Sequence, residues 1–338
     1  MHNVEFRRTD AKPKRALARL FLLAVVTASC GAPSPGQEVL IRIQDGATFR
    51  EVVDTLESRG IVEQPLRFRA YARWKGLDRS VRAGTYRLAE RAPFSEVLRD
   101  LTEGRVETYP VTIPEGLTLP AIASRLTAAV DADSATILTA LSGDSLHLAW
   151  DVPGPGLEGY LFPDTYRFAE GVTVDQVVSA MVGQYRDYWT PARRHRMAEL
   201  GMTEREVVSL AAIVQAEARR VEEMPTIASV YHNRLDINMR LQADPTVLYA
   251  LGGTRARLLY AAIDSVQDHP YNTYSQYGLP PGAICAPGES ALDTALNPIE
   301  SDFLYFVARN DGTHIFTRSL REHNRARIRV RQEAASGG

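Results

Sequence analysis

The acidic residue Glu217 stands in the otherwise apolar, helix-forming stretch AAIVQAEA (residues 211–218). Just upstream, residues 203–206 read Thr-Glu-Arg-Glu, a capping box that predicts the first turn of a helix. Apolar residues then recur every three or four positions: Val207, Leu210, Ile213 and Val214. The next step of that spacing is Glu217, so we expect its carboxyl group to leave the helix on the apolar face.

A carboxyl group beside an apolar surface can carry out acid–base chemistry. Burial disfavours the ionised form, raises the pKa and leaves an acid that still holds its proton near neutral pH. Such a group can protonate a leaving oxygen. The alternative is structural, because Glu217 lies near the expected helix end and could instead form an ion pair with Arg219 or Arg234.

Polar and aromatic residues gather downstream of Glu217, in part in segments too broken for regular elements. They supply what a sugar-binding groove needs, since amide groups bind hydroxyls and aromatic faces pack on pyranose rings. The candidate substrate-binding residues are Asn233, Gln242, Asp244, Asn272 and Tyr274. For each of them, the alternative is a residue that bonds only to nearby backbone.

The elements that must position these groups divide the chain into two parts. In the first part, residues 39–108, the sequence pattern predicts two strands and three helices. Their order is strand 39–44, helices 49–60 and 66–74, strand 83–88 and helix 93–104. This small α+β module resembles LysM glycan-binding domains. The alternative is a spacer that binds no ligand.

The second part, residues 109–330, carries the candidate chemistry. It opens with a strand, a turn and a helix from Val111, and a further helix is expected after Pro225. A β-hairpin around Asn310-Asp311-Gly312 and a basic helix follow, before a flexible tail at 331–338. The predicted fold class is therefore α+β, with a LysM-like module before a mixed α/β domain that carries the Glu217 helix and a C-terminal β-hairpin.

The N-terminus, residues 1–30, predicts an export signal or membrane anchor. A basic segment precedes the apolar residues 20–28, and small residues then lead to Cys30. A cysteine that follows small residues at the end of such a signal is typical of a bacterial lipoprotein, in which Cys30 would be lipidated. The alternative is that residues 1–30 form an uncleaved membrane anchor whose basic side stays in the cytoplasm. Both interpretations place the rest of the chain outside the cytoplasm, held to a membrane, with residues 31–38 as a linker.

Composition excludes several classes of protein. With 338 residues, a net charge of -2 and 45% hydrophobic residues, the chain is globular and shows no basic excess for nucleic acid. Two cysteines cannot form a disulfide scaffold. The seven histidines form no H-E-x-x-H array and no glycine-rich phosphate loop is present, so we expect neither a metal nor a cofactor.

Several stretches together resemble the endolytic murein transglycosylase (YceG-like) family of bacteria. They follow the family's order through most of residues 39–325. The matching segments are IPEGLT (113–118), LEGYLFPDTY (157–166), AAIVQAEA (211–218), SVYHNRL (229–235), MRLQADPTVLYAL (239–251), YNTYSQYGLPPGAICAPG (271–288) and FLYFVARNDGTHIF (303–316). The resemblance implies a LysM-like module joined to a periplasmic catalytic domain.

The resemblance also implies that Glu217 is the catalytic acid. The family motif usually reads A-S-I-V-E-K-E, and its last glutamate falls on Glu217. The chain departs from the motif at Ala212 and at Gln215, where the family commonly has a serine and another glutamate. Neither departure touches the acid, although both change the polar surroundings expected of the site.

The implied reaction is cleavage of the β-1,4 bond between MurNAc and GlcNAc inside nascent glycan strands. Ordinary glycosidases use two carboxyl groups, but here the C6 hydroxyl of the same MurNAc attacks C1 and forms a 1,6-anhydro end. One carboxyl group then suffices as acid and base. Glu158 is a second candidate acid or substrate ligand, or alternatively a structural loop residue.

The implied partners are peptidoglycan strands, cell-wall synthases at the inner membrane and the membrane itself. Two other functions stay open at this point. One is a lysozyme-like hydrolase that uses Glu217 as acid with Asp244 or Glu158 as its partner. The other is a non-catalytic peptidoglycan-binding protein.

Overall fold

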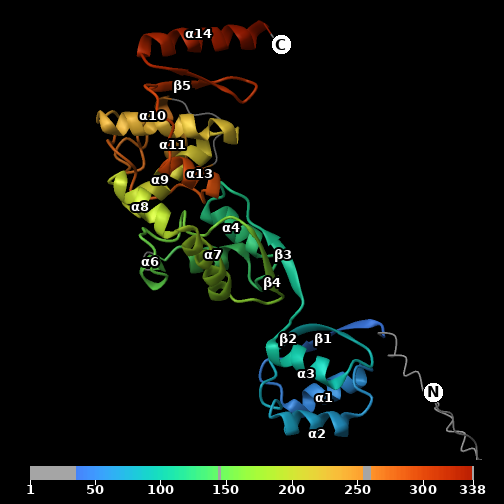
Figure 1. Cartoon of the computed structure of the whole chain (residues 1–338). Helices are drawn as coiled ribbons and strands as arrows, with labels where there is room; N and C mark the ends of the chain where they lie inside the picture. The colour runs from blue at the N-terminus through green and yellow to red at the C-terminus, as the bar shows by residue number, and fades with distance from the viewer. Residues whose placement is uncertain (1–35, 144–145, 254–259, 337–338) are drawn as a thin grey trace, which may run out of the picture.

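The computed structural model describes residues 36–143, 146–253 and 260–336 (Figure 1). The predicted export signal or anchor (1–30), with Cys30, and most of the linker lie outside the described residues. Within the described part, no helix has both the length and the apolar character needed to cross a membrane.

The first part of the fold is a small α+β unit. Its elements are β1 (Glu38–Ile43), α1 (Phe49–Ser58), α2 (Pro65–Lys75), β2 (Gly84–Ala89) and α3 (Phe94–Glu103). β1 and β2 pair antiparallel, with Ile41 opposite Tyr86. The helices pack on this pair around a core that includes the fully buried Phe68 and Tyr86.

Local sequence signals explain where these elements begin and end. Thr48 caps α1 because its hydroxyl accepts the Glu51 N–H at 3.3 Å while the Glu51 carboxylate accepts the Thr48 N–H at 2.7 Å. Gly104 ends α3 with φ +73°, a left-handed conformation that glycine adopts without a steric penalty. The elements occur in the predicted order, while the predicted likeness to LysM domains stays a prediction.

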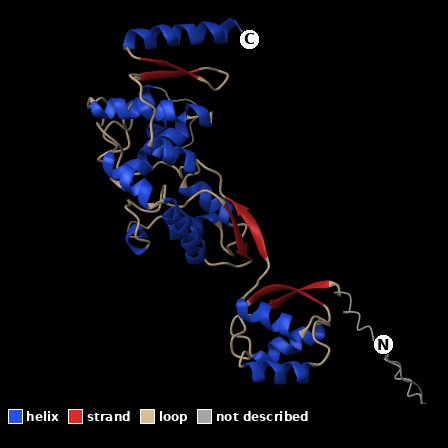
Figure 2. Cartoon of the chain, viewed as in Figure 1, coloured by secondary structure: helices blue, strands red, loops and turns tan. Residues whose placement is uncertain are grey.

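The second part is mainly helical, with short strands between the helices (Figure 2). Its helices are α4 (Leu119–Leu126), α5 (Ser134–Leu141), α6 (Leu146–Ala149), α7 (Val174–Tyr188), α8 (Pro191–Glu199), α9 (Glu204–Glu217), the 3-10 helix η1 (Val221–Glu223), α10 (Met224–Asp236), α11 (Asp244–Ala250), α12 (Tyr260–Asp264), α13 (Glu289–Leu296) and α14 (Leu320–Ser336). Its strands are β3 (Thr108–Thr112), β4 (Thr165–Ala169), β5 (Tyr305–Ala308) and β6 (His314–Thr317).

Helix α9 is the centre of this part. Thr203 and Glu206 form the predicted capping box at its start. Every residue from 207 to 214 is buried, and α10 and α13 pack against the helix. The sequence therefore predicted the helix correctly but not its surroundings, because α9 is enclosed on all sides rather than along a single apolar face.

The C-terminal β-hairpin packs on α10. β5 and β6 pair antiparallel as predicted, with Phe306 opposite Phe316. Phe306 meets the ring of Tyr231 edge-on at 5.9 Å, and His314 Nδ1 lies 2.7 Å from the carboxylate of Glu223. Helix α14 contacts both strands and forms the C-terminal end of the fold (Figure 1). The predicted α+β class is confirmed, since the described strands form three two-stranded sheets among helices.

The two parts have hydrophobic cores with no residue in common. We therefore expect Phe68→Ala to lower the free energy of unfolding of the first unit by about 3–5 kcal/mol, because it leaves a large cavity in a small core. Calorimetry of the full chain should show this unit melting earlier while the second transition stays unchanged. Phe68→Leu is the matched control and should have a smaller effect. Movement of both transitions together would contradict independent cores.

Candidate active site

Glu217 is the last residue of α9. The chain leaves the helix at Ala218 in an extended conformation (φ −76°, ψ 124°), and the Ala218 N–H still bonds to the carbonyl of Val214 at 2.9 Å. The buried body of the helix thus fixes the position of Glu217, while the helix end keeps the residue half-buried rather than enclosed. The carboxyl group is held at the edge of the core.

The direct partner of the Glu217 carboxyl group is Tyr231 of α10, whose hydroxyl donates to Oε1 at 3.0 Å. The pKa of Glu217 is raised to about 7, mainly by burial and in part by the negative charge of Asp244. The Tyr231 hydrogen bond and the positive charge of Arg234 act in the opposite direction. Near neutral pH, Glu217 therefore populates both its acid and its carboxylate form.

The predicted alternative, an ion pair of Glu217 with Arg219 or Arg234, is wrong for the described residues. Arg219 is exposed, and Arg234 is 6% exposed with its guanidinium turned to backbone. Arg234 Nε donates to the carbonyl of Leu304 at 2.7 Å, and Nη1 donates to the carbonyl of Leu241. Arg234 therefore joins α10 to the hairpin and to the segment before α11, and acts on Glu217 only through its charge.

Asp244 and Tyr274 form a hydrogen-bonded pair whose charge interactions reach Glu217. The Tyr274 hydroxyl donates to Asp244 Oδ1 at 2.5 Å. The negative charges of Asp244 and Glu217 both help to raise the pKa of Tyr274, which burial raises most. These two predicted residues and Glu217 therefore lie close enough to influence one another.

Thr273 fixes the segment that holds this pair. Its hydroxyl accepts the Ala243 N–H at 2.9 Å, and its carbonyl accepts the Gln242 N–H at 3.1 Å. Gln242 has φ +48°, a conformation unfavourable for a residue other than glycine, and its side chain is exposed beside Asp244 in the chain. Gln242 is thus free to contact a ligand.

Two predicted sugar ligands are occupied elsewhere. Asn272 is fully buried: its amide donates to the carbonyls of Ile263 and Val266, and its Oδ1 accepts the Tyr274 N–H at 3.0 Å. Asn233 donates to the carbonyls of Ser301 and Phe303 at 2.8 and 3.0 Å. Their amide groups hold the loops around the site, as in the alternative that the sequence left open, and their predicted sugar binding stays a prediction.

Gln215, one of the two departures from the usual motif, also has a structural partner. Its Oε1 accepts the N–H of Gly288 at 3.0 Å, immediately before α13. The neutral amide thus holds the start of α13 against α9. Glu217 is left as the acid at the end of this motif.

Glu158 lies in a separate environment. It is 7% exposed, and both carboxyl oxygens accept the Leu119 N–H at the start of α4, at 3.1 and 3.2 Å. Burial raises the pKa of Glu158 to about 7 as well. Gly159 then turns with φ +88° where a Cβ would lie 2.3 Å from Cβ of Ala283, so glycine is required for this packing. No described contact joins Glu158 to Glu217.

Sequence reasoning missed Tyr231 as the partner of Glu217. One signal was available, because Ile227, Tyr231 and Arg234 repeat at helical spacing and share one buried face of α10. That periodicity predicts that Tyr231 points inward with Arg234. It does not predict which helix it meets.

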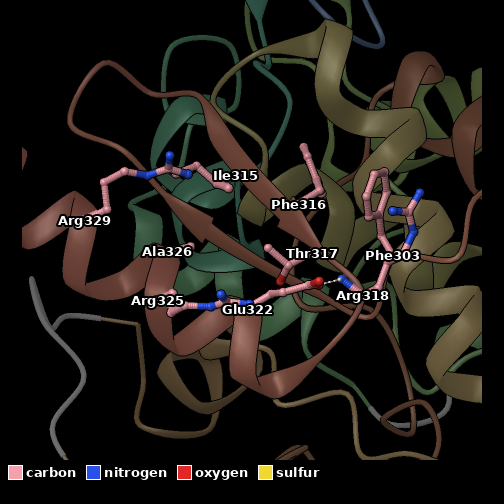
Figure 3. A pocket seen from close by; sticks show the side chains of 9 residues that line it. All are labelled: Phe303, Ile315, Phe316, Thr317, Arg318, Glu322, Arg325, Ala326 and Arg329. Carbon is pink, nitrogen blue, oxygen red and sulfur yellow. Dashed lines mark hydrogen bonds between the residues drawn. The ribbon is translucent and has the colours of Figure 1, made fainter.

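A groove lies between the hairpin and α14 (Figure 3), and Glu322 is the one acid among the described residues that line it. Its carboxylate accepts the N–H groups of Arg318 and Ser319 at 3.1 and 3.2 Å. These bonds lower the pKa of Glu322, and Arg325 and Arg329 line the same groove. An acid held ionised in this way is a poor proton donor near neutral pH, so the groove is not a candidate for acid catalysis.

The described residues contain no group of three or more His, Cys, Asp or Glu side chains arranged to hold a metal ion. Glu217 itself is suited to proton transfer, because a pKa of about 7 lets it donate and accept a proton near neutral pH. The half-buried acid, its tyrosine partner and the neighbouring Asp244 form the candidate reaction centre.

Comparison with known proteins finds matches over most of the chain. The model of the YceG-like family matches residues 41–329, a span that includes every candidate residue above. The endolytic murein transglycosylase of Bacillus subtilis (strain 168) is 31% identical over 305 residues, which cover 86% of this chain and 84% of that protein. A yceG-like protein from Listeria monocytogenes has a crystal structure that aligns with TM-score 0.59 and 31% identity, over 86% of this chain and 99% of that one.

A longer relative is the endolytic murein transglycosylase of Streptococcus pneumoniae (serotype 2 strain D39). It is 31% identical over 317 residues, which cover 85% of this chain. The match covers 57% of the streptococcal protein, so this chain spans little more than half of that relative.

Two substitutions should shift the pKa of Glu217 in opposite directions. Tyr231→Phe removes a hydrogen bond that favours the carboxylate, so the pKa should rise. Asp244→Asn removes a nearby negative charge, so the pKa should fall. Carboxyl carbon NMR titration of glutamate-labelled protein would measure both, with the Glu217→Gln spectrum assigning the signal. Shifts in the same direction would contradict the described arrangement.

The raised pKa also predicts how stability depends on pH. Glu217 titrates near 4.5 when unfolded and near 7 when folded, so stability falls as pH rises through that window. Glu217→Gln removes this pH-dependent loss of stability, because glutamine does not ionise. Its melting temperature should match that of the wild type at pH 4.5 and exceed it at pH 8. The exposed Glu222 gives a matched control, since Glu222→Gln should show no such pH-dependent difference.

Proposed function

The chain belongs to the YceG-like family, and from that premise we propose that it is an endolytic murein transglycosylase. It cuts the β-1,4 bond between MurNAc and GlcNAc within a peptidoglycan strand and leaves a 1,6-anhydroMurNAc end. The observation that carries this proposal is the half-buried Glu217 carboxyl group, whose pKa is raised to about 7 at the end of α9.

Glu217 acts first as a general acid. It donates its proton to the glycosidic oxygen as the bond from C1 to that oxygen breaks. The C6 hydroxyl of the same MurNAc then bonds to C1, and the Glu217 carboxylate takes the hydroxyl proton. The enzyme returns to its starting state and no water is consumed. A pKa near 7 suits both halves of this cycle, because neither protonation state is strongly favoured.

The neighbouring residues position this acid and its substrate. Tyr231 holds Oε1 and so fixes the direction of the carboxyl group. Asp244 maintains the raised pKa and, with Tyr274 and the exposed Gln242, offers hydrogen-bonding groups to sugar hydroxyls. Asn233 and Asn272 hold the surrounding loops. Glu158 takes no part in proton transfer.

One observation favours a second candidate, a lysozyme-like hydrolase. Asp244 is close enough to raise the pKa of Glu217, and a pair of carboxyl groups is what hydrolysis of a glycosidic bond requires. In that reaction Asp244 would activate water or stabilise the charge that develops at C1. The product would then carry a reducing end instead of an anhydro ring.

We further propose that the enzyme works outside the cytoplasm at the inner membrane. Residues 1–30 would hold it there, through lipidated Cys30 or through an uncleaved anchor. Nascent strands emerge at that surface, so synthases that make them are the expected partners. The module at 39–108 would bind glycan or position the catalytic domain on it.

The decisive experiment is product analysis by mass spectrometry after incubation of full-length protein with uncrosslinked glycan strands. We expect fragments with 1,6-anhydroMurNAc ends, each one water lighter than a hydrolysed fragment. Glu217→Gln should lower the rate by about 10²–10⁴-fold, because it removes the proton donor. Glu222→Gln, the same chemical change at an exposed position in η1, should cleave normally.

The other outcomes separate the alternatives. Reducing ends that disappear in both Glu217→Gln and Asp244→Asn would establish the hydrolase. Binding of strands without any cleavage, by wild type and variants alike, would support a non-catalytic peptidoglycan-binding protein.

A further inference from the structure

A cavity of about 760 Å³ lies beside the start of α4, and Glu217 is not among the residues that line it. Its walls are mainly apolar: Leu119, Pro120, Leu138, Leu141, Pro155 and Leu157. Two aromatic rings, Tyr249 and Tyr271, complete it, with centroids 5.0 Å apart. Its size and apolar lining are those of a small-molecule or side-chain binding site.

Glu158 supplies a buried carboxyl group to this cavity. The Leu119 N–H and the Tyr249 hydroxyl, at 3.4 Å from Oε2, both donate to it. These two donors do not saturate a carboxylate, which has about four acceptor positions. The group can therefore accept a further hydrogen bond from a ligand in the cavity.

The charge of the cavity selects the kind of ligand. Among the described residues that line it there is no Lys, Arg or His, and Glu158 is the only carboxylic acid. An anion would be repelled. A cation would gain from the carboxylate and from the faces of the two tyrosine rings. A free sugar is a poorer fit, since most of the wall offers no partner for its hydroxyls.

The cavity shares two elements with the reaction centre. Helix α11 carries Asp244 at its first residue and Tyr249 five residues later, about 7–8 Å along the helix axis. The loop after α12 likewise carries Tyr271 at the cavity and Tyr274 at Asp244. The same two segments of the chain therefore carry residues of both sites.

We propose that this cavity binds the ammonium-terminated side chain of a diamino acid in a peptide stem of the substrate. The methylene arm packs on the leucines and prolines, and the ammonium group pairs with Glu158 between the tyrosine rings. This inference rests on the proposed function, because it takes the stem from the same glycan strand whose sugars lie at Glu217. It makes Glu158 a specificity residue.

The test compares two ligands that differ by one charge. The full-length protein is titrated calorimetrically with a muramoyl tripeptide that ends in lysine, and with the same compound acetylated on the lysine Nε. We expect the free amine to bind about tenfold or more tightly than the acetylated form. Glu158→Gln should abolish that difference, since glutamine keeps an oxygen for the Leu119 N–H but carries no charge.

A second variant guards against loss of folding at Glu158. Leu138→Trp places a bulky ring in the cavity from α5 and leaves the hydrogen bonds of Glu158 untouched, so it should also abolish the preference for the amine. Equal binding of the two ligands to the wild type would overturn the proposal. A preference that survives both variants would overturn it too, because the amine would then bind elsewhere.

Cleavage of strands from which the stems have been removed distinguishes this proposal from the proposed function. Cleavage of bare strands together with equal binding of the two tripeptides would retain the reaction and reject the cavity as an amine site. If the protein preferred the free amine but cleaved no strand, the cavity would stand as an amine site and the proposed cleavage reaction would be wrong.

Discussion

The structure depends on keeping one carboxyl group at the boundary between the core and the solvent. A fully enclosed Glu217 could not meet a substrate, and a fully exposed one would be ionised near neutral pH. Placing the acid on the last turn of the enclosed helix α9 meets both demands. The Tyr231 hydrogen bond then limits the rise in pKa that burial produces, while Asp244 sustains it.

Features specified by neighbouring residues could be predicted from the sequence. The capping boxes at Thr48 and Thr203, the stop at Gly104 and the hairpin around Gly312 each follow from the chemistry of a few adjacent side chains. Periodicity also identified Glu217 as the acid beside an apolar region. Periodicity could not show that α9 is buried on all sides, because this burial depends on contacts with α10 and α13, which come from other parts of the chain.

The polar residues of the site could not be assigned from their type alone. Asn272 and Gln242 are both amides in polar segments, yet one is saturated by backbone and the other is exposed. Arg234 reaches a carbonyl 70 residues away, and Thr112 meets Thr165 across the β3–β4 pair, 53 residues apart. Such contacts exist only once the fold brings distant segments together, so no local pattern encodes them.

Glu217 and Glu158 show why a shifted pKa does not by itself identify a catalytic acid. Burial raises the pKa of each to about 7, so proton affinity alone would rank them equally. Their partners differ. Glu158 accepts the first N–H of α4 and sits within an apolar cavity, whereas Glu217 is half-buried beside Asp244, Tyr274 and an exposed Gln242. The walls around Glu158 are mainly apolar, whereas Asp244, Tyr274 and Gln242 give Glu217 the polar neighbours that a reacting sugar needs. These different surroundings support the two tasks that we propose, proton transfer at Glu217 and recognition of a cation at Glu158.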